Sequence, residues 1–583
     1  MYLKPEFAAL LQNNDAPSAS TILEVTESLK APLNELQEVE AEIQRLDELM
    51  QTMKMKRQSI QKIIDDHNII LSPARRLPSD VLHEIFFHCL PTHHNPVMNS
   101  SESPLLLTRI CSSWRAIALS SPRIWSKVYI PLPGDPSFSL GYGIITDEIT
   151  LIKRRQRFAR VLRLRCDAVR KWLSRSGTCP LSLSVTYPGN HSGIQNSRDD
   201  ELIQEMFDIL LSFADRWRDV DLSMPEDIYN KLQGDVNPTT FSSLKSLKMT
   251  LYQMPHWNNT QSTPIRLLAA PGLRRIDIFA MQTLHMTENL VQPIWNQITH
   301  ITLASSTTDI YLLVLLRQCP NLVFGKFIVD SSPWPSQTIV DQEAVHLPRL
   351  DSLAINDSGV HETMAIIFNA IKAPVLTSLS YESFNQRTPG VDFTIPVTTP
   401  VIPLLENSTL ISYLSLDGGL SSQDTKECLQ RGEQVTRVVF GKPPFANTSG
   451  HLFNADPDVV HQDRFDLKIL SISSGAVTLL PRLEFLEAYN LSSLTDEDLL
   501  DMITSRINAS QRGEAAALKS VKIYFQRQRQ KDISEEVSRL AKEAGIEVKL
   551  DLDYPTEGSR FFDPLSPSFG FTSDNDTWSS EMI

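Results

Sequence analysis

The sequence has few cysteines, and nothing in their spacing suggests pairing. Six occur among 583 residues, far apart, and none falls in a C-x-x-C arrangement. A chain of this length does not need disulfides for stability. We therefore expect reduced thiols, mostly buried, in a cytoplasmic or nuclear protein. The six are Cys89, Cys111, Cys166, Cys179, Cys319 and Cys428.

Long apolar runs and the signatures of common enzymes are also missing. No stretch of about 18 apolar residues occurs, so no membrane-spanning helix is expected, and the first residues open no secretory signal. There is no G-x-x-x-x-G-K-[ST] loop, no H-E-x-x-H motif and no G-x-S-x-G elbow. Cys89, His93 and His94 have poor spacing for a metal. We expect no enzyme, metal or cofactor.

An excess of positive charge is absent as well. The chain has 55 Lys and Arg against 69 Asp and Glu, a formal net charge of -14. Nonspecific nucleic-acid binding needs clustered cations, so this balance argues against it. A local basic run covers residues 153–157 and continues through Arg160, Arg163 and Arg165. It is either a solvated helix face or a patch for a partner.

A heptad pattern is present near the N-terminus. Its apolar positions alternate in steps of three and four, and Arg57 is the one polar interruption. They are Leu36, Val39, Ile43, Leu46, Met50, Met53, Ile60 and Ile64. About four heptads of this kind predict either a coiled-coil homodimer or one amphipathic helix packed on its own domain. Pro73 is expected to end the helix.

A second pattern returns along most of the chain: apolar, two residues, apolar, one residue, apolar. Successive first positions are separated by 27, 29, 25, 52 and 26 residues, and later spacings are less regular. The copies are 217/220/222, 244/247/249, 273/276/278, 298/301/303, 350/353/355, 376/379/381, 411/414/416, 435/438/440, 467/470/472, 483/486/488 and 518/521/523. This is the leucine-rich-repeat pattern, with one short strand in each repeat. A further copy is expected near residue 322, where the register is blurred.

The segments between these copies predict how the strands are connected. Residues 310–319 and 363–372 have helical apolar spacing, and each is followed by a proline and then a strand motif. Helix, turn and strand in this order return each strand in the same direction, as parallel strands require. Most copies lack the asparagine of regular repeats, so an irregular arc is expected. The alternative is a set of unrelated strands in several α/β units.

Residues 77–130 predict a separate helical cluster. The segment LPSDVLHEIF at 77–86 places Val81, Leu82, Ile85 and Phe86 in one apolar stripe. A polar loop over 88–104 follows. Residues 105–130 then predict a second helix that ends at Pro122, with Trp125 as a large anchor beyond it.

This segment resembles the F-box family, in order and in spacing. The matching residues are Leu77, Pro78, Asp80, Leu82, Ile85 and Phe86, then Ile110, Cys111, Trp114 and Arg115, then Ser121, Pro122 and Trp125. The arrangement also resembles F-box proteins of mushroom-forming fungi, in which a heptad helix precedes the box and degenerate repeats follow. The loop over 88–104 is longer than in many members.

The resemblance implies a three-helix cluster that binds the small adaptor subunit of a cullin–RING ubiquitin ligase. By position, the contact residues would be Leu77, Pro78, Leu82, Ile85, Phe86, Ile110 and Trp114. Ile85 and Trp114 are equally compatible with internal core positions. Pro78 is expected at the interface, and Trp125 is expected in the core, where it joins the box to the first repeat.

These observations together predict an α+β protein of five parts. They are a poorly ordered N-terminus (1–28), an amphipathic or coiled-coil helix (29–72), an F-box three-helix cluster (73–130), an irregular leucine-rich-repeat α/β solenoid with parallel strands (155–553) and a disordered acidic tail (555–583).

The expected function is recruitment of a target protein for ubiquitination, without catalysis by this chain. The expected partners are the ligase adaptor subunit, an unidentified target protein and, through 29–72, a second copy. Nucleic acid and membrane are not expected. A scaffold with a drifted F-box is one alternative, and a repeat arc that binds a carbohydrate or another small molecule is another.

Overall fold

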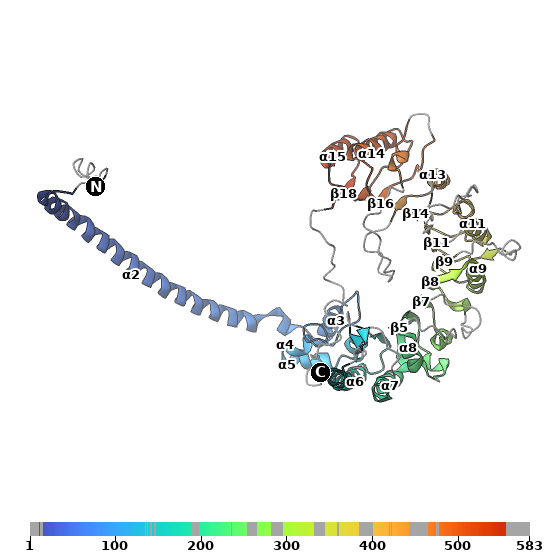
Figure 1. Cartoon of the computed structure of the whole chain (residues 1–583), viewed down its shortest axis with the longest axis horizontal. Coiled ribbons are helices and arrows are strands. Elements are labelled where there is room, and N and C mark those ends of the chain that lie inside the picture. The colour runs from blue at the N-terminus through green and yellow to red at the C-terminus, as the bar shows by residue number, and fades with distance from the viewer. Residues whose placement is uncertain are drawn as a thin grey trace. The chain divides into compact units, whose positions relative to one another are not determined.

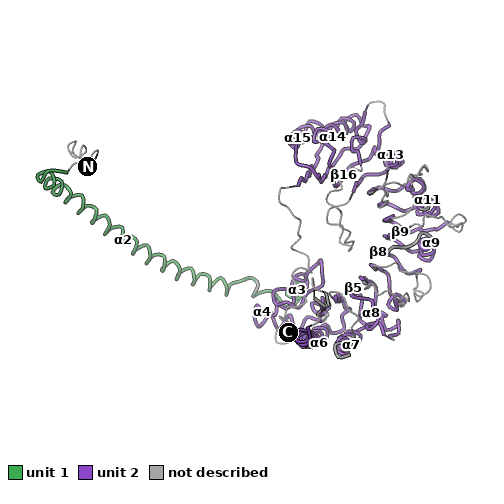
Figure 2. The backbone as a smooth tube through the Cα atoms, viewed as in Figure 1, with its two compact units in different colours: residues 1–84 green, residues 85–583 purple. Residues whose placement is uncertain are grey.

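The computed structural model describes residues 11, 16–134, 136, 138–139, 143–144, 147–187, 197–234, 236–252, 265–280, 295–330, 344–357, 361–383, 400–418, 420, 422–441, 465–473 and 477–555. It is mixed helix and strand, with a long N-terminal helix and a large parallel sheet, and this confirms the coarse α+β expectation. The chain divides into two units, Met1–Glu84 and Ile85–Ile583 (Figure 2). The predicted tail at 555–583 lies outside the described residues beyond Pro555.

The first unit consists mainly of helix α2 (Ala19–Leu71), which is 53 residues long. The helix begins ten residues earlier than the predicted start at residue 29, so residues 19–28 belong to it. Ser18 caps it by accepting a hydrogen bond from the Thr21 amide at 3.3 Å, and Ile22 and Leu29 extend the apolar spacing backward. The helix ends before Pro73, as predicted, and the short helix η1 (Pro73–Arg76) follows.

Short helices follow α2. Helix α3 (Ser79–His88) contains the division between the units, and α4 (Leu107–Ile110), α5 (Ser112–Leu119) and η2 (Pro122–Trp125) lie in the second unit. Residues 89–106 between α3 and α4 form the predicted loop. This loop is not simply polar and solvated, because Leu90, Val97, Met98 and Leu105 are buried in it.

Within the residues described, the second unit contains a parallel sheet of 14 strands, in which each strand pairs with the next strand of that sheet along the chain (Figure 1). The strands are β1 (Lys127–Pro131), β4 (Leu181–Thr186), β5 (Trp217–Pro225), β6 (Ser246–Tyr252), β7 (Arg275–Ala280), β8 (His300–Thr308), β9 (Phe324–Asp330), β11 (Ser352–Asp357), β13 (Ser378–Ser383), β14 (Tyr413–Gly418), β15 (Arg437–Phe440), β16 (Phe485–Leu491), β17 (Ser520–Phe525) and β18 (Lys549–Asp553). The short strands β2 (Phe138–Ser139), β3 (Gly143–Ile144), β10 (Val345–His346) and β12 (Ile371–Lys372) pair outside it.

Helical segments connect many of these strands and lie along one side of the sheet (Figure 1). The α-helices are α6 (Glu148–Arg175), α7 (Ser197–Leu211), α8 (Glu226–Gln233), α9 (Asp309–Gln318), α11 (His361–Ala370), α12 (Ile402–Asn407), α13 (Ser422–Arg431), α14 (Asp496–Gln511) and α15 (Ser534–Glu543). The shorter segments are η3 (Ala214–Arg216), η4 (Pro238–Phe241), η5 (Arg266–Ala269), η6 (Trp295–Gln297) and η7 (Leu467–Leu470). Residues predicted helical at 310–319 and 363–372 fall mostly in α9 and α11.

The repeated apolar motif places its second and third residues on strands in all copies except one. Leu247 and Met249 on β6 are typical: both are buried, while Lys248 between them faces away. Buried residues of neighbouring strands lie side by side, as the pairing of Leu247 with Ile276 shows. Stacked rows of such residues form a continuous core between the sheet and the helices.

The exception is the predicted copy 467/470/472, which forms the short helix η7 instead of a strand. Leu467 and Leu470 are both buried three residues apart, a spacing that a single 3-10 turn satisfies. Asp466 caps this turn by accepting from the Lys468 amide at 3.0 Å. Only 16 residues separate this copy from the next, too few for another helix and strand.

The blurred copy near residue 322 is strand β9. Glycine replaces the expected apolar residue at position 325, between buried Leu322 and buried Phe327. A Cβ atom at Gly325 would lie 2.7 Å from the Phe327 ring, so that ring already occupies the space of the missing side chain. The apolar motif is incomplete in this copy because the Phe327 ring fills its own position and also the space of the side chain that is missing at position 325.

The predicted boundaries at 130 and 155 are also wrong. The sheet already begins at β1, where Val128 and Ile130 are buried on one face, and residues 155–175 belong to α6. The basic run lies on α6, and most of its cations are exposed. Arg165 is neither solvated nor available to a partner, because it is buried and donates to the Pro131 carbonyl at 2.6 Å.

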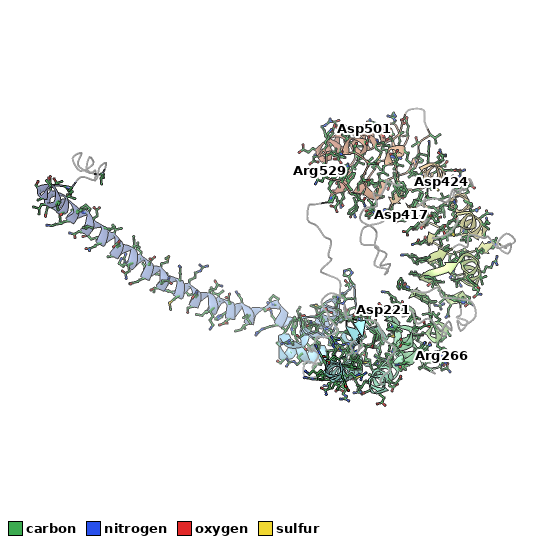
Figure 3. All side chains as sticks on the ribbon, in the orientation of Figure 1. Asp221, Arg266, Asp417, Asp424, Asp501 and Arg529 are labelled. Carbon is green, nitrogen blue, oxygen red and sulfur yellow. The ribbon has the colours of Figure 1, made fainter. Side chains whose placement is uncertain are left out.

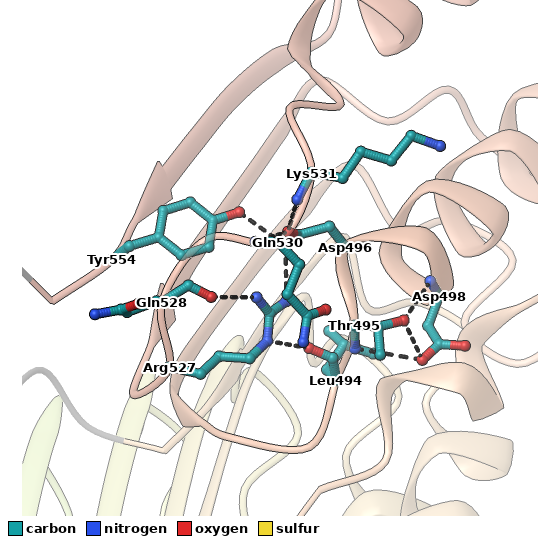
Figure 4. A network of polar contacts seen from close by, with 9 residues as sticks. All are labelled: Leu494, Thr495, Asp496, Asp498, Arg527, Gln528, Gln530, Lys531 and Tyr554. Atoms are coloured by element: carbon teal, nitrogen blue, oxygen red, sulfur yellow. Dashed lines mark hydrogen bonds and ion pairs between the residues drawn. The ribbon is translucent and has the colours of Figure 1, made fainter.

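The C-terminal part of the sheet is held by two charged residues of α14. Asp496 is buried and accepts from Arg527 at 2.7 Å, the Gln530 amide at 2.8 Å, the Lys531 amide at 2.7 Å and the Tyr554 hydroxyl at 2.9 Å (Figure 4). These bonds fix the chain after β17 and after β18 to the start of α14.

Arg506 lies further along the same helix and is also buried. It donates to the carbonyls of Leu470, Leu480 and Leu479 at 2.9, 3.2 and 2.6 Å. Burial lowers the pKa of Arg506 to about 10, which leaves it charged at neutral pH. The guanidinium therefore connects the backbone at Leu470 and at Leu479–Leu480 to α14.

The six cysteines are free thiols, but only Cys166, Cys319 and Cys428 are buried. Burial raises the pKa of each of these three to about 12. Cys179 is half-buried, and Cys89 and Cys111 are exposed, so the expectation of mostly buried thiols holds for half of the set. Among the residues described, no helix has both the length and the apolar character needed to cross a membrane.

Candidate docking surfaces

The seven contact residues predicted for the 73–130 segment do not all face solvent. Leu77, Pro78, Ile85 and Ile110 are exposed and Trp114 is half-buried, whereas Leu82 and Phe86 are 5% and 0% exposed. The prediction that Leu82 and Phe86 contact a partner is therefore wrong for this conformation. Both are core residues.

Helical spacing explains which residues of α3 are covered. Leu82 and Phe86 are four residues apart and lie on one face, and Val81 and Ile85 lie on the adjacent face. Val81 and Ile85 remain 40% and 38% exposed. The apolar stripe read from the sequence is thus divided between a buried and an exposed side.

Within the second unit, Trp114 of α5 packs on Phe86, with ring centroids 5.0 Å apart. The exposed fraction of Trp114 is intermediate, so this residue is partly core and partly surface. Cys111 separates α4 from α5 and caps α5, since its sulfur accepts from the Trp114 amide at 3.4 Å. Arg115 donates to the Thr108 carbonyl at 2.7 Å, which holds the two short helices together.

Around this bend, apolar side chains stay in contact with solvent. Ile110 is 54% exposed, and Leu106 and Leu119 are exposed as well. Short helices that present aliphatic side chains beside a half-buried tryptophan resemble the core of a protein–protein interface.

Trp125 is fully buried, which confirms its predicted core position. Its indole nitrogen donates to the Ala118 carbonyl at 2.8 Å, and its ring meets Trp172 of α6 edge-on at 4.8 Å. Trp172 in turn donates to the Lys127 carbonyl at 3.1 Å. These contacts join the short helices to the first strand of the sheet.

A second candidate surface lies on the side of the sheet away from the helices. In Figure 3, Asp221 on β5 and Asp417 on β14 mark this side, whereas Asp424 on α13 and Asp501 on α14 mark the helical side. The open side of β5 to β8 carries mainly short polar or charged residues, such as Asp219, Ser246 and Thr302. From β14 to β17 it also carries aromatic and cationic residues, beginning with Tyr413 and Arg437.

We call these residues the strand-face patch: Tyr413, Arg437, Phe485, Glu487, Tyr489, Lys522 and Tyr524. The strand register places them in neighbouring rows. Arg437 lies beside Tyr413 and Phe485, Glu487 beside Lys522, and Tyr489 beside Tyr524. Residues far apart in the sequence thus form one contiguous surface.

The side chains of the strand-face patch contact one another. Arg437 lies over the Phe485 ring at 4.6 Å, and Tyr489 stacks on Tyr524 with centroids 4.7 Å apart. Lys522 lies 4.9 Å from the Tyr524 ring centroid and 3.6 Å from the Glu487 carboxylate. Such contacts fix the aromatic rings before any partner arrives, which lowers the entropy cost of binding.

The patch is only partly hydrated. Burial, followed by the hydrogen bond to Glu487, raises the pKa of the Tyr489 hydroxyl. Burial likewise raises the pKa of Tyr413. Tyrosine and arginine are among the residues that most often supply binding energy at protein interfaces, and rigid aromatic side chains give contact area at low entropy cost.

Sequence analysis missed the strand-face patch, although its signal was present. The residues between the apolar positions of each motif face the open side, because strand side chains alternate. Those positions in the last copies include Arg437, Phe485, Glu487 and Lys522. Tyr489 and Tyr524 follow two residues after Glu487 and Lys522.

In the described part of the chain, no group of three or more His, Cys, Asp or Glu side chains is arranged to hold a metal ion. No family model matches the sequence. No curated protein matches it either. One solved structure, a Bacteroides fragilis protein from a structural genomics programme, is 13% identical over 57% of this chain and 71% of its own, with a TM-score of 0.25. A likeness at this level carries no argument about fold or function.

Proposed function

We propose that this chain is a non-catalytic adaptor of an SCF-type cullin–RING ubiquitin ligase. The segment 73–130 would be an F-box that binds the ligase adaptor subunit, and the sheet unit would be a degenerate leucine-rich-repeat solenoid that binds a target protein. The observation that carries this proposal is the order of residues from Leu77 to Trp125, which matches the F-box pattern.

The exposure of five of those side chains supports them as contacts of the adaptor subunit. Ile85 and Ile110 are exposed, Trp114 is half-buried, and Leu77 and Pro78 are exposed ahead of α3. Exposed aliphatic residues beside a partly covered tryptophan supply the few anchors that dominate such interfaces. Leu82 and Phe86 would support the binding helices from the core.

The sheet supports the second half of the proposal. Its strands are parallel, follow chain order and keep their apolar motif residues in register. Repeats of this kind present an extended surface without catalytic groups. The strand-face patch would be the part of that surface that binds the target.

The adaptor interface is tested by a double variant, Ile85→Asp with Ile110→Asp. Two carboxylates at desolvated anchor positions should weaken binding of the purified adaptor subunit by about 100-fold or more. The measurement is a titration of the full chain with the adaptor subunit. A charge at Leu82 is not used, because that side chain is buried and the change would unfold the segment.

The matched control is Ile149→Asp with Ile152→Asp, since both side chains are exposed on α6. It should bind the adaptor subunit like the unmodified chain. If the folded, unmodified chain does not bind the adaptor subunit at all, the ligase proposal is overturned. A non-catalytic scaffold would then be the better account.

Target binding is tested by Phe485→Ala with Tyr524→Ala. Loss of two preorganised rings should reduce capture of the target by roughly 30-fold when ubiquitin transfer is blocked. Tyr311→Ala on α9 removes an exposed aromatic ring from the helical side and should capture the target normally. Equal target capture by both variants would place the target on another surface.

A further inference from the structure

Helix α2 has a long apolar face that no described residue of its own unit covers. No residue of this 53-residue helix is buried, and a helix of that length spans about 80 Å. Figure 3 shows its side chains projecting on all sides. Apolar residues exposed over such a distance mark an interaction surface.

The face is a heptad seam interrupted at three positions, and it is longer than the four heptads seen in the sequence pattern. If Leu36 is assigned position a, the a and d positions run from Ile22 to Leu71. All are apolar except Pro32, Arg57 and His67; they are Ile22, Val25, Leu29, Leu36, Val39, Ile43, Leu46, Met50, Met53, Ile60, Ile64 and Leu71. A strict seven-residue repeat of this length favours a left-handed coiled coil.

We propose that α2 forms an antiparallel two-stranded coiled coil with α2 of a second copy of this chain. In the register that overlaps nearly the whole helix, Leu36 lies opposite Ile60 of the second copy. Ile43 then lies opposite Met53, and Leu46 opposite Met50. The proposal is independent of the ligase assignment.

The charges beside the seam oppose a parallel pair. In a parallel dimer, equal positions face each other, so Arg57 would meet Arg57 within the core. The flanking g and e positions would bring Glu35 against Glu40 and Glu42 against Asp47. Each of these contacts joins like charges.

The same residues favour the antiparallel pair. In the register given above, Arg57 lies opposite Val39, next to Glu40 of the second copy. At the flanking positions, Glu42 meets Lys56 and Glu40 meets Lys54, and the two-fold axis repeats both attractions. One like-charge contact remains, because Asp47 of one copy faces Asp47 of the other at the two-fold axis.

The first test is the dissociation constant of the full chain, measured by sedimentation equilibrium. Met50→Asp places a carboxylate in the seam of both copies and should raise the dissociation constant about 100-fold. Met55→Asp makes the same change five residues later, at position f on the outer face, and should leave the constant unchanged.

The second test measures helix direction. Glu42→Lys should weaken an antiparallel dimer by about fivefold, and Lys56→Glu should do the same, because each turns an attraction into a repulsion. The double variant restores the attraction and should regain the original dissociation constant. Glu48→Lys and Lys62→Glu, both at outer positions, are the matched controls.

Each other outcome overturns part of the proposal. A folded chain that remains monomeric at all concentrations overturns the dimer proposal as a whole. A dimer strengthened by Glu42→Lys and unaffected by Lys56→Glu is parallel, because in that arrangement residue 42 faces Asp47 and residue 56 faces Gln61. A dimer unaffected by Met50→Asp is formed elsewhere in the chain.

Discussion

Replacing Arg506 by leucine should lower the free energy of unfolding of the sheet unit by about 3 kcal/mol. The substitution leaves three buried carbonyls, of Leu470, Leu479 and Leu480, without their donor. Part of this cost is offset, because burying a leucine side chain does not carry the desolvation penalty of burying a charged guanidinium. Urea denaturation followed by circular dichroism measures the change.

Two further variants separate the hydrogen bonds of Arg506 from its charge. Arg506→Lys keeps the charge, but a single ammonium cannot reproduce the planar fork that reaches three carbonyls, so most of the stability should still be lost. Arg512→Leu removes an exposed arginine at the end of the same helix and should cost less than about 0.5 kcal/mol. If Arg506→Leu unfolds at the same urea concentration as Arg512→Leu, the three carbonyl contacts do not stabilise the fold.

Acid should destabilise the C-terminal part of the sheet through Asp496. Burial raises the pKa of this carboxylate, but the hydrogen bonds from Arg527, Lys531, Gln530 and Tyr554 outweigh burial and hold the pKa at about 2. A pKa below the ordinary value of 3.8 stabilises the fold when the group is ionised. The contribution, about 2.5 kcal/mol, is present above pH 4 and is lost as the pH falls toward 2.

Asp496→Ala should therefore destabilise the unit by about 3 kcal/mol at neutral pH, because it also leaves partly buried donors without an acceptor. Asp496→Asn should remove the acid-dependent loss between pH 4 and 2. Asp501→Asn, on an exposed position of α14, should retain it. The measurement is the urea midpoint at several pH values, and parallel curves for the unmodified chain and Asp496→Asn would contradict the assignment.

Sequence periodicity predicted the sheet well because most buried positions follow a simple rule. Residues such as Leu353 and Ile355 alternate with polar ones, and their strands pair as the repeat spacing requires. The apolar pattern failed at two places, where the local packing of side chains rather than their residue types decided the structure. Gly325 hides a strand because Phe327 fills its space, and Leu467 mimics a strand motif while forming a 3-10 turn.

The candidate docking surfaces were harder to predict than the sheet. An apolar stripe does not reveal which side of a short helix will be covered, so Leu82 and Ile85 looked alike until tertiary packing separated them. Asp496 and Arg506 resemble ordinary surface charges in the sequence. Their burial depends on backbone carbonyls and amides that only the folded chain brings near them.

The chain-order pairing of the strands has a consequence for biosynthesis. Each strand finds its partner among residues made shortly before it, so no early segment waits for the far end of the polypeptide. The core can therefore form during synthesis, as one strand after another is added to the sheet. A late contact in this order is the hydrogen bond from the Tyr554 hydroxyl to Asp496 at the start of α14, which forms only after residue 554 has been synthesised.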